Sequence, residues 1–323
     1  MTQLRDIDTI QNNVPHRFEI LLIDSFSPNT EVPGSGDFSI HITSKDPLNR
    51  ELFTENNKQS DKNNLISTTL VEMMALGSIL NTGQIPEGHF AFFAAISKFE
   101  KEGSFHVDAP IEGKCELLSE KANFHRYKAT LTQGKASASS QLMAFFTDGN
   151  IAKDSSSAKI KDLPSLSTLS SIQAPTFKSP HLWLIETLLY QNTEEKRVIF
   201  EYTYPTDHPC TKGHFPGNPV MMGVMQWLMV EDALSALIQN NTQDSNHSLI
   251  PNSALIPGTV LRCHADILLA DGTTVCEIKN ASALLSETQD SLKATLASTQ
   301  KVLFREMVKP GQRLLIDLTL LEE

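Results

Sequence analysis

Two long apolar stretches stand out from an otherwise mixed pattern of hydrophobic and polar positions. They read LISTTLVEMMALGSIL (65–80) and VMMGVMQWLMVEDALSALI (220–238). Over their middle turns, apolar side chains would fall on nearly every face of a helix, and such a helix is buried rather than laid on a surface. The pattern therefore predicts two buried helices, one in each half of the chain.

Strand-like segments surround each predicted helix in a similar order. In the first half they are VPHRFEILLIDSF (14–26), DFSIHITS (37–44) and the stretch 113–146. In the second half they are SPHLWLIETLLYQ (179–191), RVIFEYTYP (197–205), TVLRCHADILLADGTTVCEIKN (259–280) and 300–323. The dipeptide Asp271-Gly272 is typical of a hairpin turn. One buried helix among five or more strands predicts an antiparallel sheet wrapped around a helix, an α+β fold present twice.

The clearest change of composition lies at 148–180, where serine, lysine and proline crowd and hydrophobic periodicity is weak. A connection of this length is unusual inside one compact domain, so it favours two units. We predict a first domain at 1–150, a linker at 151–178 and a second domain at 179–323.

Composition limits the function classes. The 323 residues are 40% hydrophobic and 20% charged, which is ordinary for a globular protein. Lys+Arg number 27 against 38 Asp+Glu, a formal net charge of −11. Phosphate contacts supply most nucleic-acid affinity, so an acidic chain without a basic stripe is a poor nucleic-acid binder.

The location is predicted from the cysteines and the N-terminus. Four cysteines are scattered without a CxxC pair, which favours free thiols in a reducing compartment over a disulfide framework. The first twenty residues carry acids early and lack an apolar core segment, so we expect no secretory signal. No apolar run is long enough to span a bilayer. We therefore expect a cytoplasmic protein that does not bind membranes.

The stretch GHFPGNPVMMGVMQ (213–226) resembles the signature of the hot-dog-fold 3-hydroxyacyl-[acyl-carrier-protein] dehydratases. In that family a histidine before Phe-Pro-Gly precedes the buried central helix. The opening DIDTIQNNVPHRFEILLID (6–24) resembles the N-terminal segment of the same family. Because the two stretches lie in different halves, the resemblance implies two hot-dog units fused in tandem.

The resemblance places a carboxylate fourteen positions after the histidine. Counted from His214, that position is Leu228, so the second half lacks the carboxylate; Glu231 and Asp232 follow too late to replace it simply. In the first half Glu72 occupies the carboxylate position, but Lys58 stands where the histidine belongs. Since family members dimerise and share active sites, the resemblance implies one composite site from His214 and Glu72, and a dead counterpart.

The resemblance also implies a role for each residue. His214 would take the α-proton, with its other ring nitrogen held by the backbone carbonyl of Val220. Glu72 would protonate the departing hydroxyl, and we expect its apolar surroundings to raise its pKa by desolvation. The backbone N–H of Gly223, at the helix start, would bind the thioester carbonyl. Phe215 and Gly217 complete the predicted substrate-binding set.

Less specific interpretations stand beside these. The family tends to have a glutamine one turn after the carboxylate, where this chain has Leu76. His208, Cys210 and His214 have a spacing that suggests a metal, but no fourth ligand lies nearby, and we expect neither metal nor cofactor. His16 and His181 occupy matching positions after proline, where a capping role is the simpler interpretation.

The predicted function is dehydration of 3-hydroxyacyl chains carried on acyl carrier protein to trans-2-enoyl thioesters, in fatty-acid or polyketide/polyene-type synthesis. An (R)-specific enoyl-CoA hydratase is the alternative within enzymes, and a non-catalytic acyl-thioester-binding or scaffold partner is the alternative of another class. Glutamate rather than aspartate at position 72 resembles members that only dehydrate. Chain length, pairing of whole chains, and completeness of the second unit at its C-terminus stay open. Candidate contacts for an acidic carrier are Lys98, Lys101, Arg126 and Arg305.

Overall fold

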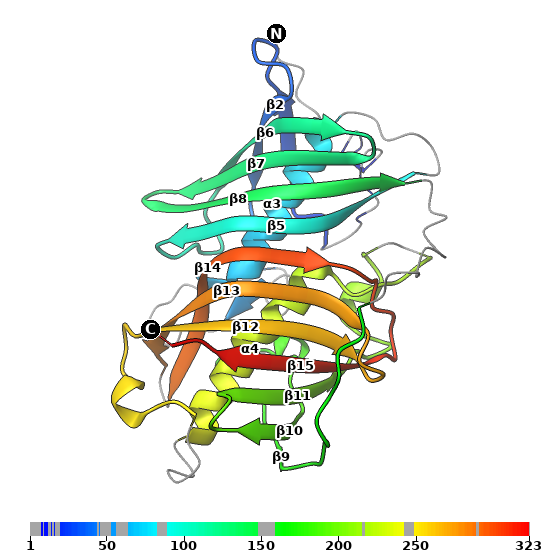
Figure 1. Cartoon of the computed structure of the whole chain (residues 1–323). Helices are drawn as coiled ribbons and strands as arrows, with labels where there is room; N and C mark the ends of the chain where they lie inside the picture. Colours follow the sequence, from blue (N-terminus) through cyan, green and yellow to red (C-terminus); the bar gives the residue numbers. More distant parts are fainter. Residues whose placement is uncertain are drawn as a thin grey trace.

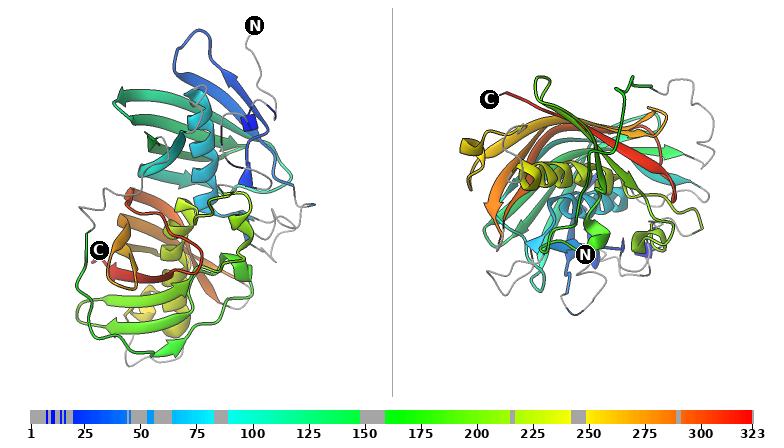
Figure 2. Two further views of the ribbon diagram at one scale, coloured as in Figure 1. Left: turned by 90° about the vertical axis from the view of Figure 1, so that its right-hand side faces the viewer. Right: turned by 90° about the horizontal axis from the view of Figure 1, so that it is seen from below.

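One antiparallel sheet of thirteen strands, curved around two buried helices, makes up the fold of this computed structural model (Figure 1). Figure 2 shows, in its right-hand view, the sheet arching over both helices. The structure describes residues 8, 10–11, 14, 16, 20–43, 45, 53–55, 64–82, 89–147, 159–214, 217–241, 249–288 and 291–322. No helix in these ranges is both long and apolar enough to cross a bilayer.

The first half wraps its strands around helix α3 (Ser67–Asn81), which is buried over nearly its whole length. Phe38 fixes the helix to the sheet, because a Cβ added at Gly77 of the helix or Gly113 of the sheet would lie under 2.5 Å from its ring. The absence of side chains at these two positions thus allows helix and sheet to approach closely. The strands are β1 (Ser25–Pro28), β2 (Ser35–Ile40), β5 (Phe90–Glu102), β6 (Ile111–Lys121), β7 (Phe124–Gln133) and β8 (Ala136–Thr147). A separate pair is β3 (Thr54–Glu55) with β4 (Asn64–Leu65).

The second half repeats the plan around helix α4 (Gly223–Asn241). The strands are β9 (Ser170–Ser171), β10 (Thr187–Asn192), β11 (Arg197–Thr203), β12 (Val260–Leu269), β13 (Thr274–Glu287), β14 (Leu292–Phe304) and β15 (Arg313–Leu320). Short 3-10 helices are η3 (Pro180–Leu182), η4 (Pro209–Thr211) and η6 (Asn252–Ala254). The predicted turn at Asp271-Gly272 joins β12 to β13, with Gly272 at a φ of 87°. The predicted fold class, two tandem hot-dog units of α+β type, is confirmed.

Strand order differs between the halves. Numbered along the chain within each half, the large strands of the first lie in the order 1-2-4-5-6-3. Those of the second lie in the order 1-2-6-3-4-5. The second unit is therefore rearranged relative to the first: strand β15 is inserted between β11 and β12.

The halves meet through a pair of strands and through their central helices. Strand β5 pairs antiparallel with β14, with Ile96 opposite Val302, which makes the two sheets continuous. Helices α3 and α4 also contact each other. Trp227 of α4 packs edge-to-face on Phe99 of β5, with ring centroids 4.9 Å apart. The junction is thus a packed core rather than a surface contact.

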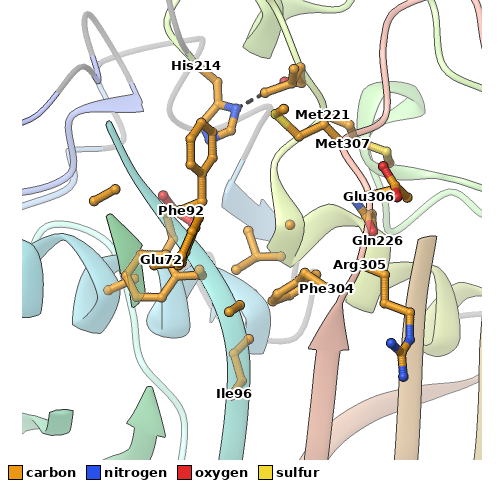
Figure 3. A pocket seen from close by; sticks show the side chains of 18 of the residues that line it. Glu72, Phe92, Ile96, His214, Met221, Gln226, Phe304, Arg305, Glu306 and Met307 are labelled. Atoms are coloured by element: carbon orange, nitrogen blue, oxygen red, sulfur yellow. Dashed lines mark hydrogen bonds between the residues drawn. The ribbon is translucent and has the colours of Figure 1, made fainter. Parts of the chain in front are cut away.

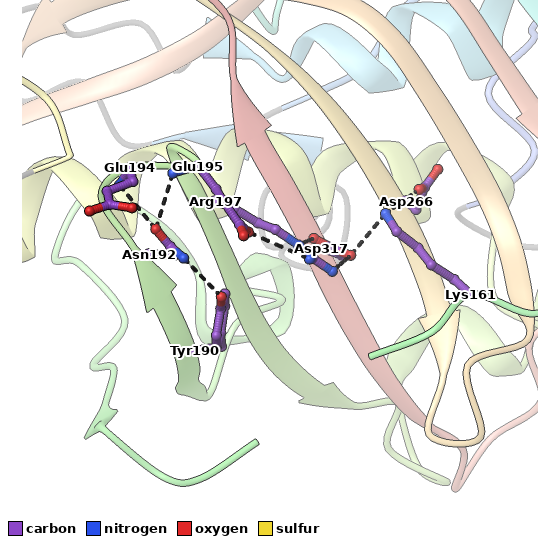
Figure 4. Close-up of polar contacts among 8 residues, drawn as sticks. All are labelled: Lys161, Tyr190, Asn192, Glu194, Glu195, Arg197, Asp266 and Asp317. Atoms are coloured by element: carbon purple, nitrogen blue, oxygen red, sulfur yellow. Dashed lines mark hydrogen bonds and ion pairs between the residues drawn. The ribbon is translucent and has the colours of Figure 1, made fainter. Parts of the chain in front are cut away.

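The described part of the predicted linker, 159–178, lies against the second half. Lys161 reaches across the outer face of the sheet to Asp266 at 2.6 Å and Asp317 at 2.8 Å (Figure 4). Arg197 donates two hydrogen bonds of 2.8 Å to the same Asp317 carboxylate. Ser170–Ser171 adds a short strand beside β10. The domain boundaries at 150 and 178 stay predictions.

Candidate active site

A cavity of about 720 Å³ lies at the junction, where β5 and β14 meet beside the two helices. Figure 3 shows His214 and Glu72 on its wall, with Phe92 between them in this view. His214 comes from the second half and Glu72 from the first. The apolar part of the wall includes Val71, Ala75, Phe92, Phe93, Ile96, Phe124, Phe145, Val220, Met221, Val224, Phe304 and Met307. Both halves are needed to form this cavity.

His214 follows helix η4, and its backbone N–H donates to the carbonyl of Cys210 at 3.0 Å. Its ring Nδ1 lies 3.0 Å from the carbonyl oxygen of Val220, which is the hydrogen bond that the sequence resemblance implies. A carbonyl only accepts, so Nδ1 carries the proton and Nε2 keeps its lone pair. Burial, and then the neighbouring His16, lower the pKa of His214 to about 4. At neutral pH the ring is therefore uncharged and able to accept a proton.

Glu72 lies on the inner face of α3 and is 5% exposed. Its Oε1 is 3.3 Å from Nε2 of His16. Desolvation acts to raise the pKa of Glu72, but the hydrogen bond from His16 and the charges of His16 and His214 together leave it lowered. The expectation of a raised pKa is therefore wrong: the sequence showed the apolar neighbours of Glu72 and not its polar partner.

His16 is the residue that sequence reasoning missed. It is 3% exposed, and its ring lies edge-on to the ring of His214 with centroids 5.1 Å apart. The signal was the repeated Pro-His pair, which was interpreted as a cap. Its counterpart His181 is exposed in η3, against the ring of His208. The two matching histidines therefore have different surroundings.

The entrance to α4 forms another part of the wall. Gly223 is the first residue of the helix and lines the cavity. A Cβ at this position would lie 3.1 Å from the ring of Phe304, so the ring leaves no ordinary room for a side chain. The first N–H groups of a helix have no partner within the helix. Gly223 therefore places a backbone donor where little else fits.

The other predicted binding residues have different positions. Val220 is buried and lines the cavity. Gly217 is exposed at a φ of 85° and is not among the cavity-lining residues of the described part of the chain. Its conformation gives a structural reason for glycine there. Phe215 and Lys58 lie outside the described residues.

Gln226 is a buried polar residue of the cavity that the sequence did not single out. It lies on α4, 3% exposed, and its side chain contributes to the cavity wall. Its amide oxygen has no hydrogen-bond partner among the described residues. A buried acceptor without a partner is costly, so this oxygen is suited to accept a hydrogen bond from a ligand.

The counterpart of Glu72 in the second half, Leu228, is buried and lines a void of about 20 Å³. Glu231 and Asp232 are occupied elsewhere. Asp232 pairs with buried Lys178 and accepts from the N–H of Leu184 at 2.8 Å, and Glu231 accepts from the N–H of Leu296 at 2.8 Å. These two carboxylates therefore hold α4 to its surroundings. Leu76, at the position where the family tends to have glutamine, is fully buried.

Three buried donors, His16, Glu72 and His214, offer one metal-ligating atom each, all within 4.8 Å of one another. All three residues already have a polar partner: His16 and Glu72 contact each other, and His214 is hydrogen-bonded to the carbonyl of Val220. Around a tetrahedral zinc ion, neighbouring ligand atoms are about 3.4 Å apart, which is closer than the 4.8 Å that spans this cluster. Both ring nitrogens of His208 are in hydrogen bonds, to the carbonyl of His181 and from the N–H of Cys210. We interpret the three-residue cluster as a site for acid–base chemistry.

Comparisons with known proteins agree with the motif. A family described as ApeI-like, with the ApeI dehydratase as its type, matches residues 190–268. The 3-hydroxyacyl-[acyl-carrier-protein] dehydratase FabZ of Xylella fastidiosa strain M23 is 26% identical over 122 residues, 33% of this chain and 72% of that protein. The matched family segment contains His214, Val220 and Gly223, whereas His16 and Glu72 lie outside it.

Two solved dehydratase structures match at low identity and low TM-score. The dehydratase domain of RzxB from Pseudomonas fluorescens is 10% identical and covers 93% of this chain and 99% of that domain, with a TM-score of 0.43. The dehydratase heterocomplex ApeI:P from Xenorhabdus doucetiae is 12% identical and covers 44% and 92%, with a TM-score of 0.34. By the family match and the FabZ identity, the chain is similar in sequence to dehydratases, and its fold holds two hot-dog units in one polypeptide.

Proposed function

We propose that the chain is a dehydratase that eliminates water from 3-hydroxyacyl thioesters on acyl carrier protein, giving trans-2-enoyl thioesters for fatty-acid or polyketide-type synthesis. The observation that carries the proposal is the junction cavity. At this cavity a ring nitrogen of His214, from one half, lies within 4.8 Å of a carboxylate oxygen of Glu72, from the other half. Each half alone lacks one residue of the pair.

In the proposed reaction, Nε2 of His214 removes the α-proton. The hydrogen bond from Nδ1 to Val220 fixes the ring, and its low pKa keeps Nε2 free of a proton before the step. The backbone N–H of Gly223 donates to the thioester oxygen, where enolate-like charge develops. The carboxyl of Glu72 gives a proton to the β-hydroxyl as the C–O bond breaks, so water leaves.

A substrate carried on a phosphopantetheine arm is supported by the cations on the cavity wall. Lys159, Arg305 and Lys309 line the same cavity as His214. Lys159 and Arg305 are both exposed, and both pair with Glu277, whose pKa they lower to about 2. Cations at the rim suit a phosphodiester and an acidic carrier protein. The other candidate cations, Lys98, Lys101 and Arg126, are not among the lining residues that the structure describes.

The test is to incubate the protein with 3-hydroxyacyl carrier proteins of several chain lengths and to follow loss of water by mass. We expect dehydration by the wild type and a loss of 10²- to 10⁴-fold in His214→Ala and Glu72→Gln, the usual range for acid–base groups. Equal rates in all three proteins would refute the mechanism. Turnover of the coenzyme A thioester alone would favour the hydratase, and absence of turnover with retained binding would favour the scaffold. A cytoplasmic location and any pairing of whole chains stay predictions.

A further inference from the structure

We propose that His16 is a positioning residue of this site that stores the proton which Glu72 gives to the departing hydroxyl. The inference rests on the proposed dehydration. It adds a third functional residue, and one that the proposed pair of His214 and Glu72 does not include.

His16 contacts both of the other residues. Its Nε2–H donates to Oε1 of Glu72 at 3.3 Å, and its ring lies against that of His214 with centroids 5.1 Å apart. All three side chains are buried. A proton on His16 can therefore reach Glu72 directly, and the two rings are close enough to exchange a proton through one bridging group.

A purely structural role explains the contact poorly. Burying a carboxylate and an imidazole costs free energy that their attraction rarely exceeds, so a buried ion pair is weak support for stability. The chain itself offers the matched case. His181 follows Pro180 as His16 follows Pro15, but its half has Leu228 in place of a carboxylate, and His181 is exposed. The histidine is buried only in the half that retains the glutamate.

A proton store answers a difficulty in the proposed reaction. The pKa of Glu72 is lowered by His16, so near neutral pH its carboxyl is ionised and has no proton to give. Together the pair can hold one proton, which passes from His16 to Glu72 during the reaction.

The protons balance over one turnover. The α-proton moves to Nε2 of His214 and the α-carbon electron pair forms the new C=C bond. The C–O bond breaks, the oxygen takes the proton from Glu72, and Glu72 takes the proton of His16. The site then holds protonated His214, ionised Glu72 and neutral His16. Return of the proton from His214 to His16, through Glu72 or the product water, restores the resting state without any other reactant.

Few other titratable groups face this cluster among the described residues. The thiol of Cys210 lies near Glu72, but burial raises its pKa to about 12, so it stays neutral. The charged residues Lys159, Arg305, Glu306 and Lys309 also line the cavity, and all four are exposed.

Two substitutions separate storage from orientation. In His16→Gln the side-chain N–H can still donate to Glu72 but cannot release a proton, and in His16→Phe both properties are lost. His181→Gln is the matched control. For each variant, kcat and KM are measured from pH 6 to 9 on a carrier-linked substrate that the wild type dehydrates and His214→Ala does not. Thermal unfolding is recorded alongside.

We expect kcat to fall 10²- to 10³-fold in both His16 variants, with KM within about threefold of the wild type. The deficit should shrink toward pH 6, because without His16 desolvation is left to raise the pKa of Glu72 and solvent can then protonate it. His181→Gln should match the wild type. Wild-type kcat and pH profile in His16→Gln would overturn proton storage, whether or not His16→Phe is impaired. Dehydration that His214→Ala does not affect would instead refute the proposed function, and this inference with it.

A measurement on the unaltered histidine covers the case in which a His16 variant does not fold. In protein labelled with ¹⁵N-histidine, Glu72→Gln removes the carboxylate to which His16 donates. Proton storage requires a proton on both ring nitrogens of His16 in the resting wild type, and we expect one of these protons to be absent in Glu72→Gln at the same neutral pH. The same number of protons on the His16 ring in both proteins would also overturn the proposal.

Discussion

Gly223→Ala is the substitution whose effect follows most directly from the geometry. The added Cβ would lie 3.1 Å from the Phe304 ring, where ordinary contacts begin at 3.4 Å, so ring or helix start must move by at least 0.3 Å. The φ of Gly223 is not positive, so alanine is not strained by the backbone itself. The perturbation is therefore a displacement within the cavity, at the donor proposed to bind the thioester oxygen.

The size of the effect can be worked from that displacement. A misplacement of about 1 Å at a reacting centre costs about 100-fold in rate, and loss of one oxyanion donor costs 10²- to 10³-fold. A shift of a few tenths of an ångström should thus lower kcat by about 3- to 10-fold. Overpacking of this kind costs about 1–3 kcal/mol of stability.

Phe304→Leu supplies the matched control, because it removes the ring that the new methyl group would meet. We expect the double variant Gly223→Ala, Phe304→Leu to recover most of the kcat lost in Gly223→Ala. Dehydration of a 3-hydroxyacyl carrier protein gives kcat, and thermal unfolding gives stability. Wild-type kcat in Gly223→Ala, or a double variant no faster than the single one, would refute this account of the glycine.

Three further predictions concern other parts of the molecule. Asp317→Asn should lower the free energy of unfolding by about 2–4 kcal/mol near neutral pH. This loss is smaller than that expected for breaking a fully buried ion pair, because Arg197 and Lys161 are partly exposed. The pKa of Asp317 is lowered in the fold, so its contribution is complete above its unfolded value near 4 and is lost as pH falls through the lower folded value. The free energies of unfolding of the wild type and Asp317→Asn, measured by denaturant titration, should therefore converge as the pH is lowered. A difference that does not change with pH would contradict the assignment. The dehydration rate should fall as the pH drops through about 4, because His214 then gains a proton and can no longer act as the base. Circular dichroism at each pH checks that the fold is intact. A rate that already falls well above pH 4 would mean that another group limits it. Gln226→Leu should raise KM about tenfold with little change in kcat if its amide oxygen binds substrate, and an unchanged KM would remove it from the binding set.

Local sequence was sufficient for the helices and the motif. Apolar runs without a polar face predicted α3 and α4 within a few residues, since burial of every face leaves no other interpretation. The fourteen-residue spacing between histidine and carboxylate directed attention to Glu72 rather than Leu228. These features are encoded within one segment each.

Features that depend on two distant segments were not predictable in the same way. Strand β5, which joins the halves by pairing with β14, was not predicted as a strand, and of β14 only the end at 300–304 lay in a predicted strand segment. Strand β5 reads FAFFAAISKFEKE, apolar on both faces at its start, without the alternation of a half-buried strand. The lowered pKa of Glu72 depends on His16, more than fifty residues earlier. The strand order of the second half follows from long-range pairing that no local pattern carries.

The pairing of β5 with β14 has a consequence for how the protein is made. When β5 leaves the ribosome, one side of its backbone hydrogen-bonding groups has no partner, because the paired strand β14 begins only at residue 292. An unpaired edge strand is a template for association with other chains. During synthesis the nascent chain must therefore protect this edge, by delayed folding or by a chaperone, until β14 has emerged.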